Sequence, residues 1–203
     1  MTRTTRMTRA RVLAACSLVV LLGCGGEAAV TPTPSSAHSP HSPHGTTNVT
    51  SDAKTDDVDA RLAEVARVHG GAGPWAVAGY RMGAFALHSL GLERGSFDLE
   101  VTHYSPHEVQ YACIADGASA ATGASLGKLN LSLESAAAPD THTVYRRRST
   151  KQSLTLRVSK SFTTHFLDVP RERLGEAGRE AMLLPDADVF EVVRDARDVP
   201  DIR

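Results

Sequence analysis

Two glycine-punctuated blocks of this sequence carry side chains of the kind that bind transition metals. His69 opens the first block, and three glycines follow it within four positions. Cys113 opens the second block, and Asp116 stands three residues after it, so both side chains share a face if the block is helical. Imidazole, thiolate and carboxylate groups all bind zinc, at about 2.0–2.3 Å. The alternative interpretation is a histidine at a helix end and a buried, inert thiol.

The segment after the second block contains a lysine at a glycine turn. Lys128 follows Gly127 and precedes an alternating stretch, so its ammonium group stands where it could bind an anionic group of a ligand. A solvated turn lysine is the alternative. The sequence has no serine nucleophile elbow, phosphate-binding loop or dinucleotide fingerprint, and we therefore expect no nucleotide cofactor.

Helical patterns precede and separate the two blocks. An acidic pair at 56–57 precedes apolar residues spaced as one face of an N-capped helix, which ends at the first glycines. Pro74 is suited to the first turn of the next helix, which runs to Gly91. The expected helices are 57–69, 74–90, 116–122 and 170–183.

Period-two alternation predicts the strands of a sheet. Apolar and polar residues alternate clearly at 97–102, where Phe, Leu and Val face one side. The expected strands are 97–102, 129–133, 143–147, 154–158 and 188–193. This order of helices and strands predicts an α+β fold, with an antiparallel sheet packed against helices in a single domain.

Residues 1–23 predict a secretory signal. Four arginines without an acid precede an apolar run at 12–22, which is too short for a membrane-spanning helix of about twenty residues. The sequence Leu-Leu-Gly-Cys at 21–24 resembles a bacterial lipobox, which makes Cys24 the lipidated first residue of the mature chain. We expect an exported protein that meets the membrane through its lipid anchor only. Gly25 favours the outer membrane, facing the periplasm or the cell surface, and a plain signal peptide is the alternative.

Composition divides the rest of the chain. Residues 24–56 are rich in Pro, Ser and His and poor in large apolar residues, so we expect a disordered linker. Residues 57–203 have the length of one domain, in which Cys113 is the single thiol. Loss of the signal lowers Lys and Arg from 22 to 18 against 23 Asp and Glu, a net charge of −5. A mildly acidic exported chain has no electrostatic reason to bind nucleic acid.

Taken together, the motifs resemble the FmdE family, which is named after a formylmethanofuran dehydrogenase. The resemblance rests on four segments, which are 69–75, 79–83 (Gly-Tyr-Arg-Met-Gly), 113–117 (Cys-x-x-Asp-Gly) and 122–130. It implies a cleft that holds a metal, often zinc, with His69 and Cys113 as ligands, and it suggests a homodimer. The ligand-binding residues that it implies in the second block are Asp116, Thr122, Gly127, Lys128 and Asn130.

The sequence also departs from the family pattern. Gly71 stands where a second histidine is expected, and Gly73 and Ala124 stand where some members have further metal ligands. Zinc usually takes three or four protein ligands, and His69 with Cys113 supplies two. The histidines that folding could bring near them are His103, His107 and His165.

Three functions follow from this incomplete ligand set. The first, which accounts best for it, is a membrane-tethered binding domain that holds zinc or a small ligand in the cleft. The second is a metal-dependent enzyme in which the metal activates water or polarises a carbonyl group. The third is a degenerate interaction domain that kept the fold and lost the metal. The molybdenum or tungsten chemistry of the archaeal enzyme is not expected, because the chain has no catalytic-subunit features.

Overall fold

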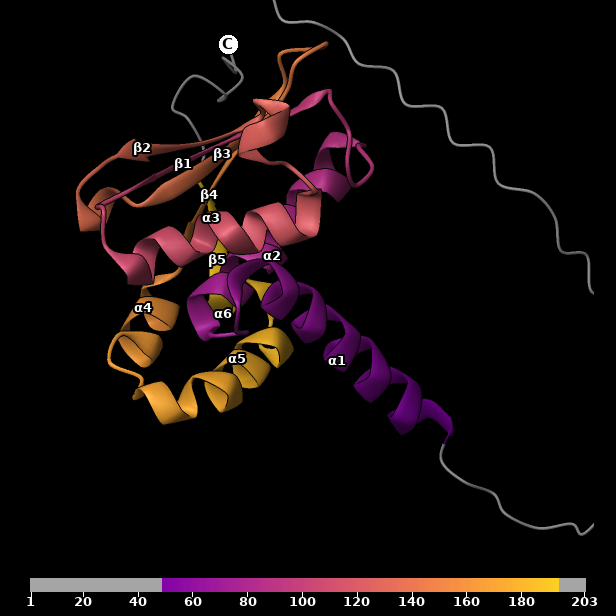
Figure 1. The fold of residues 1–203 in the computed structure, drawn as a ribbon, viewed down its shortest axis with the longest axis vertical. Coiled ribbons are helices and arrows are strands. Elements are labelled where there is room, and N and C mark those ends of the chain that lie inside the picture. Colours follow the sequence, from indigo (N-terminus) through magenta and orange to yellow (C-terminus); the bar gives the residue numbers. More distant parts are fainter. Residues whose placement is uncertain (1–48, 194–203) are drawn as a thin grey trace, which may run out of the picture. The chain divides into compact units, whose positions relative to one another are not determined.

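A computed structural model describes the backbone of residues 49–193 and the side chains of residues 55–193. The expected signal peptide, Cys24 and residues 25–48 of the expected linker lie outside the described residues. The helices are α1 (Val49–His69), α2 (Pro74–Leu90), α3 (Val109–Thr122), α4 (Lys160–Phe166), α5 (Leu174–Leu183) and α6 (Asp186–Val189). The strands are β1 (Leu99–Ser105), β2 (Leu131–Ser135), β3 (His142–Arg147), β4 (Ser153–Val158) and β5 (Phe190–Val193). Figure 1 shows the resulting α+β fold, as the sequence predicts.

All five strands belong to one sheet, in the order β2-β1-β3-β4-β5. The β1–β3, β3–β4 and β4–β5 pairs are antiparallel, whereas β1 and β2 run parallel, with Val101 opposite Leu131. Parallel neighbours need a crossover connection, and α3 is that crossover. Helix α3, which carries Cys113, therefore connects β1 to β2 and contacts both strands.

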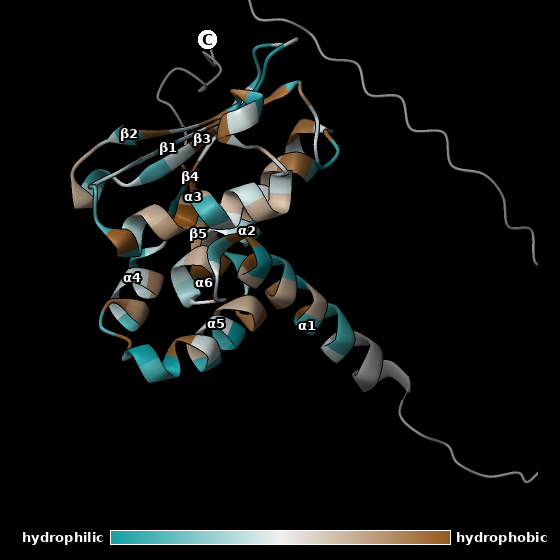
Figure 2. Cartoon of the chain, viewed as in Figure 1, coloured by the Kyte–Doolittle hydropathy of each residue, from teal (hydrophilic) through white to brown (hydrophobic). Residues whose placement is uncertain are grey.

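The helices cover the sheet in two layers (Figure 1). Helix α3 contacts β1 and β2, and α2 contacts β3 and β4. Helix α1 packs against α3 and α2, and α5 packs against α2 and α1. Figure 2 shows both hydrophilic and hydrophobic residues along α1 and α5, as expected for helices with one covered side. Within residues 49–193, no helix is both long and apolar enough to span a bilayer.

Strand β1 shows why this face of the sheet is covered. Leu99, Val101, His103 and Ser105 are buried, and the residues between them are half-buried. The side chains of a strand alternate between its two faces, so these four point to the helix layer. One of the four is a histidine, which makes the core under α3 partly polar.

Glycines let α2 and α3 approach each other closely. A Cβ atom at Gly117 would lie 1.8 Å from the carbonyl oxygen of Ala76, and one at Gly79 would lie 2.0 Å from that of Ile114. Any side chain at either position would force the helices apart. The glycines of both motif segments thus fix α3, and with it Cys113, against α2.

Several helix boundaries differ from those expected. Helix α1 begins at Val49, so residues 49–56 are helical rather than part of the linker, because a helix packed at 58–65 extends outward at little cost. Helix α3 begins at Val109 instead of 116, since its small residues give little apolar periodicity. Helix α4 was not expected, and Ser159 caps it by accepting a hydrogen bond from the Phe162 N–H at 3.0 Å. Helix α6 occupies the first part of the segment expected as the last strand.

Candidate functional site

His69 is the last residue of α1, and the loop after it is open. Gly70 has a left-handed backbone (φ +87°), and its N–H bonds to the carbonyl of Ala66 at 2.8 Å, which ends the helix. A Cβ atom at Gly71 would meet nothing within 4 Å among the described residues. The glycine at 70 is therefore required by the turn, whereas Gly71 leaves space beside the imidazole.

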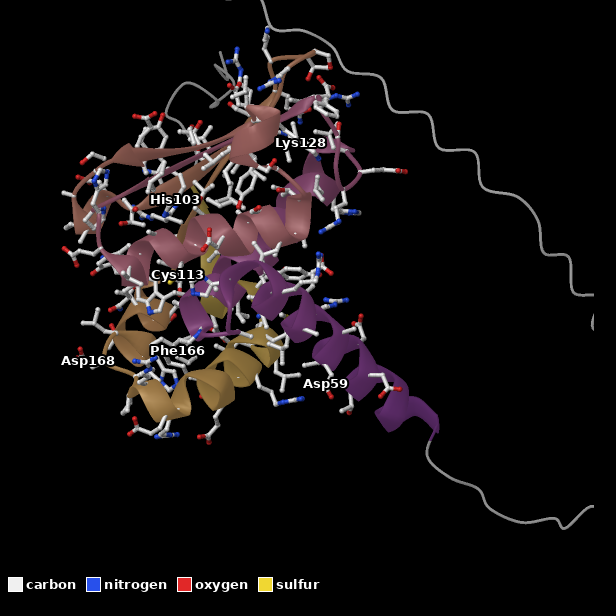
Figure 3. The ribbon with its side chains drawn as sticks, in the orientation of Figure 1. Asp59, His103, Cys113, Lys128, Phe166 and Asp168 are labelled. Atoms are coloured by element: carbon white, nitrogen blue, oxygen red, sulfur yellow. The ribbon has the colours of Figure 1, made fainter. Side chains whose placement is uncertain are left out.

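Folding brings the two motif blocks together at this imidazole. Nδ1 of His69 lies 2.9 Å from Oδ2 of Asp116. Cys113, three residues before Asp116 on α3, lies near the same ring and on the same wall as His69. In Figure 3, His103 lies on the sheet side of α3 and Cys113 lies on its other side. The structure therefore unites three of the residues that the motifs indicated, from α1 and α3.

These contacts determine the charge of His69. Its pKa rises from 6.5 to about 10, first because of the hydrogen bond to Asp116 and then because of the one to Cys113, while partial burial opposes the rise. The imidazole is therefore protonated at neutral pH until a ligand displaces the proton. A metal would have to do so, because only the neutral ring binds a metal.

Two hollows meet at this cluster. The first, of about 440 Å³, lies between α3 and β2, and we call it the α3–β2 hollow. The second, of about 650 Å³, lies between loop 70–73, α3 and segment 166–175, and we call it the glycine-loop hollow. His69, Val109 and Cys113 line both. Both volumes are typical of small-molecule sites. Because the same three residues line both hollows, a molecule bound in either hollow would lie beside His69 and Cys113.

Part of the glycine-loop hollow is formed by residues that no motif indicated. Phe166, Leu174 and Arg171 line it together with Trp75, the last residue of the first motif block. Trp75 is 5% exposed and donates a hydrogen bond from Nε1 to the Phe166 carbonyl at 3.0 Å. These residues come from segments some ninety positions apart. Only the folded structure brings them together, so a sequence pattern could not have found them.

The other histidines considered as ligands have different environments. His103 is fully buried, with Nδ1 2.8 Å from Thr143 Oγ1 and Nε2 3.1 Å from the Tyr111 carbonyl. Burial lowers its pKa to about 4, so it is a neutral core residue. His165 pairs with Glu180 at 2.8 Å in a separate hollow of about 700 Å³ at α4.

His107 is exposed in the loop before α3. Within the part of the chain that the structure describes, none of His103, His107 and His165 lines the two hollows at His69. They therefore do not complete the ligand set of His69 and Cys113.

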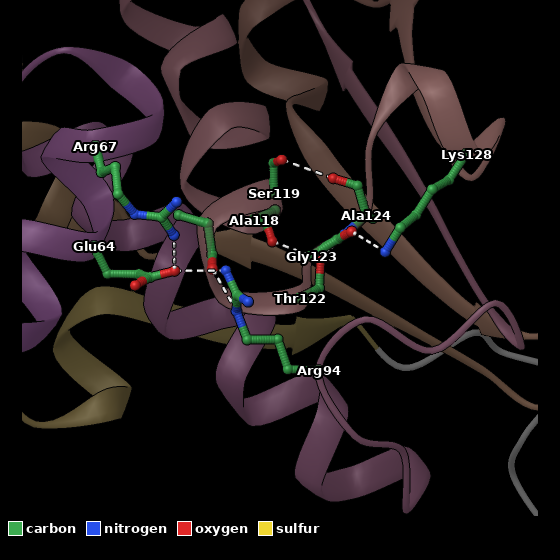
Figure 4. A network of polar contacts seen from close by, with 10 residues as sticks. Glu64, Arg67, Arg94, Ala118, Ser119, Thr122, Gly123, Ala124 and Lys128 are labelled. Carbon is green, nitrogen blue, oxygen red and sulfur yellow. Dashed lines mark hydrogen bonds and ion pairs between the residues drawn. The ribbon is translucent and has the colours of Figure 1, made fainter. Parts of the chain in front are cut away.

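Two residues of the second block hold the end of α3. Thr122 Oγ1 donates to the carbonyl of Ala118 at 2.7 Å, and Lys128 Nζ donates to the carbonyl of Gly123 at 2.9 Å (Figure 4). Lys128 also lies over the ring of Phe97, 5.3 Å from its centroid. A cation at a helix C-terminus satisfies free carbonyl groups and the helix dipole. Through these contacts Thr122 and Lys128 stabilise the end of α3.

The remaining residues of that block attach the following turn to the sheet. Asn130 is buried, and its side chain accepts a hydrogen bond from the Ser125 N–H at 3.0 Å and donates one to the Leu99 carbonyl at 3.1 Å. Gly127 is exposed, and Ala124 is buried. Over residues 55–193, neither hollow at His69 is lined by Thr122, Gly127, Lys128 or Asn130.

The cluster supplies only part of a metal site. Among the described residues, no three His, Cys, Asp or Glu side chains are arranged to hold a metal ion. His69 and Cys113 are a nitrogen and a sulfur donor. Asp116 hydrogen-bonds to the imidazole, as carboxylates commonly do behind metal-bound histidines. His69 and Cys113 are therefore two possible donors, fewer than the three or four protein ligands that a zinc ion usually has.

Comparison with known families agrees with the motifs. The sequence model described as "FmdE, Molybdenum formylmethanofuran dehydrogenase operon" matches residues 68–191. The match is more than half of the 203-residue chain and runs from the end of α1 into β5. No curated protein matches the sequence. On this match the chain belongs to the FmdE family.

Proposed function

We propose that this chain is an exported, lipid-anchored binding domain that holds a metal ion, most suitably zinc, or a small ligand at His69 and Cys113. The observation that carries the proposal is the pairing of the His69 imidazole with Asp116 next to Cys113, where two hollows lined by both His69 and Cys113 meet. An imidazole and a thiolate together suit zinc better than the hard cations that prefer oxygen ligands.

Each of the three side chains has its own role. His69 and Cys113 bind directly, and Asp116 orients the imidazole through Nδ1. A bound zinc ion would supply a positive charge that attracts an oxygen or sulfur atom of a ligand. The two hollows provide the space for that ligand, and their walls determine its shape.

Zinc titration of the full chain tests the proposal. After removal of bound metal, competition with a fluorescent chelator gives the zinc affinity. His69→Ala and Cys113→Ala should each lower it roughly 100-fold or more, because each removes one of two protein ligands. His165→Ala is the matched control, since His165 also pairs with a carboxylate but lies in a separate hollow. Wild-type affinity in both site variants would exclude this site.

Restoring the missing ligand gives a second test. Gly71→His places an imidazole in open space beside His69, so zinc affinity should rise at least about tenfold. Gly127→His is the control, because it adds the same group at an open glycine away from both hollows. An equal affinity of Gly71→His and wild type would mean that this loop does not face the metal.

A second candidate function uses the same side chains for catalysis. A thiol beside an imidazole that a carboxylate orients resembles the arrangement of a cysteine nucleophile and its base. If Cys113 is such a nucleophile, iodoacetamide should alkylate it faster than free cysteine at neutral pH, and His69→Ala should slow that reaction. Peptide mapping identifies the modified thiol. A rate equal to that of free cysteine would leave binding as the function.

A further inference from the structure

We propose that the glycine-loop hollow binds a small organic anion, a carboxylate on an apolar chain, with Arg171 holding the carboxylate. The anion site rests on the proposed function only in taking this domain to bind a small ligand, and it names the chemical class of that ligand. It does not depend on a metal ion at His69.

Among the arginines of residues 55–193, Arg171 differs in lacking a partner. The guanidinium of every other arginine in that range has an ion pair or a hydrogen bond to a carbonyl group. Arg173, two residues away, pairs with Glu176 at 3.1 Å. Arg171 lines the hollow, and within the described fold its donors are unused. A planar guanidinium with free donors binds a carboxylate through two parallel hydrogen bonds.

Apart from Arg171 and from His69, Gln110 and Cys113, the other side chains of the wall are apolar. Trp75 and Phe166 form its buried part. Val109, Leu167 and Leu174 line its outer part and are 82%, 41% and 37% exposed, so they present apolar surface to water. A ligand chain that covers them would remove apolar surface from water, which stabilises the complex.

The glycine loop gives the ligand room to lie along this wall. Gly70 and Gly71 contribute backbone without side chains, and a Cβ atom at either would meet no described atom within 4 Å. Figure 3 shows Phe166 and Cys113 near each other, and both line the hollow. A carboxylate at Arg171 would therefore leave the apolar chain lying between Phe166 and the loop, with its end toward Cys113.

Trp75 provides a local signal for testing this, because it is the only tryptophan in the sequence and it lines the hollow. The metal-free full chain is titrated with octanoate, and separately with octanamide, below the concentrations at which either aggregates. Tryptophan fluorescence should change saturably with octanoate, which should bind about fivefold more tightly than its neutral analogue. Arg171→Gln should bring that ratio close to one, and Arg171→Lys should restore part of it.

Arg173→Gln is the matched control, since it removes a neighbouring arginine that already has a partner and should keep the wild-type ratio. The proposal is overturned if octanoate gives no saturable change, if octanamide binds equally well, or if Arg171→Gln keeps the preference for octanoate. Repeating the titration with zinc separates the two proposals. Failure to bind zinc excludes the metal alone, and failure to prefer octanoate excludes the anion site alone.

Discussion

His69 is held by a carboxylate through one ring nitrogen, and that contact sets both its orientation and its charge. A proton and a metal ion therefore compete for this imidazole. Zinc binding should release a proton at neutral pH, because the ring is charged before the metal arrives. The carboxylate of Asp116 thus keeps the His69 ring protonated and also fixes its orientation.

The role of the carboxylate can be measured directly. Asp116→Asn removes the largest cause of the raised pKa, so the pKa of His69 should fall from about 10 toward its usual 6.5. Titration of the ring protons by NMR gives this value. Glu180→Gln, which removes the partner of His165, should leave it unchanged. A pKa near 10 in Asp116→Asn would show that Cys113 alone charges the ring.

His103 has the opposite effect on stability. Its folded pKa, about 4, lies below the unfolded value of 6.5, so its contribution is present above pH 6.5 and is lost as the pH falls toward 4. His103→Gln should remove this slope, a difference on the order of 3 kcal/mol between pH 7 and 4. Urea unfolding at several pH values measures it, and parallel curves for the two proteins would contradict it. The contribution of His69 runs the other way, being lost as pH rises from 6.5 through about 10.

The elements differ in how far the sequence predicts them. Helix α2 begins and ends as expected, because Pro74 and Gly91 define its limits by local geometry. The strands are predicted within a few residues, since alternation follows directly from having one covered face. Helix α4 and the start of α3 are not predicted, because their stability comes from contacts with distant segments.

The candidate site shows the same division. Its three clustered residues, His69, Cys113 and Asp116, were indicated by motif and spacing. The sequence did not indicate that Lys128 stabilises the end of α3. Its partner there is a backbone carbonyl group, and a pattern of side chains does not show which backbone groups are free. Arg171 could not be found either, since what marks it is the absence of a partner in the described fold.

Contact between α2 and α3 should tolerate no side chain. Gly117→Ala places a methyl group 1.8 Å from the Ala76 carbonyl oxygen, so the helices must separate. The free energy of unfolding should fall by at least about 1–3 kcal/mol. Gly127→Ala is the control, because its Cβ atom would lie in open space and its stability should be close to that of wild type. Equal urea midpoints for the two variants would show that the helices can shift without cost.

We propose that the whole molecule is attached to a membrane through one lipidated cysteine, Cys24. Residues 1–24 contain four arginines, an apolar run and the sequence Leu-Leu-Gly-Cys, which resemble the signal of such a protein. We expect the mature chain to begin at Cys24 with lipid attached and to fractionate with membranes. Cys24→Ser should be released or left unprocessed, while Cys16→Ser should behave as wild type. Mass spectrometry showing an unmodified N-terminus at another residue would contradict this.

Glycines serve two purposes in this molecule, and the difference bears on its evolution. Gly117 cannot change without moving a helix, but Gly71 stands in a loop where a new side chain meets nothing among the described residues. A side chain can therefore be gained or lost at position 71 in a single substitution while the core stays intact. The loop can change what it contacts one residue at a time without disturbing the fold.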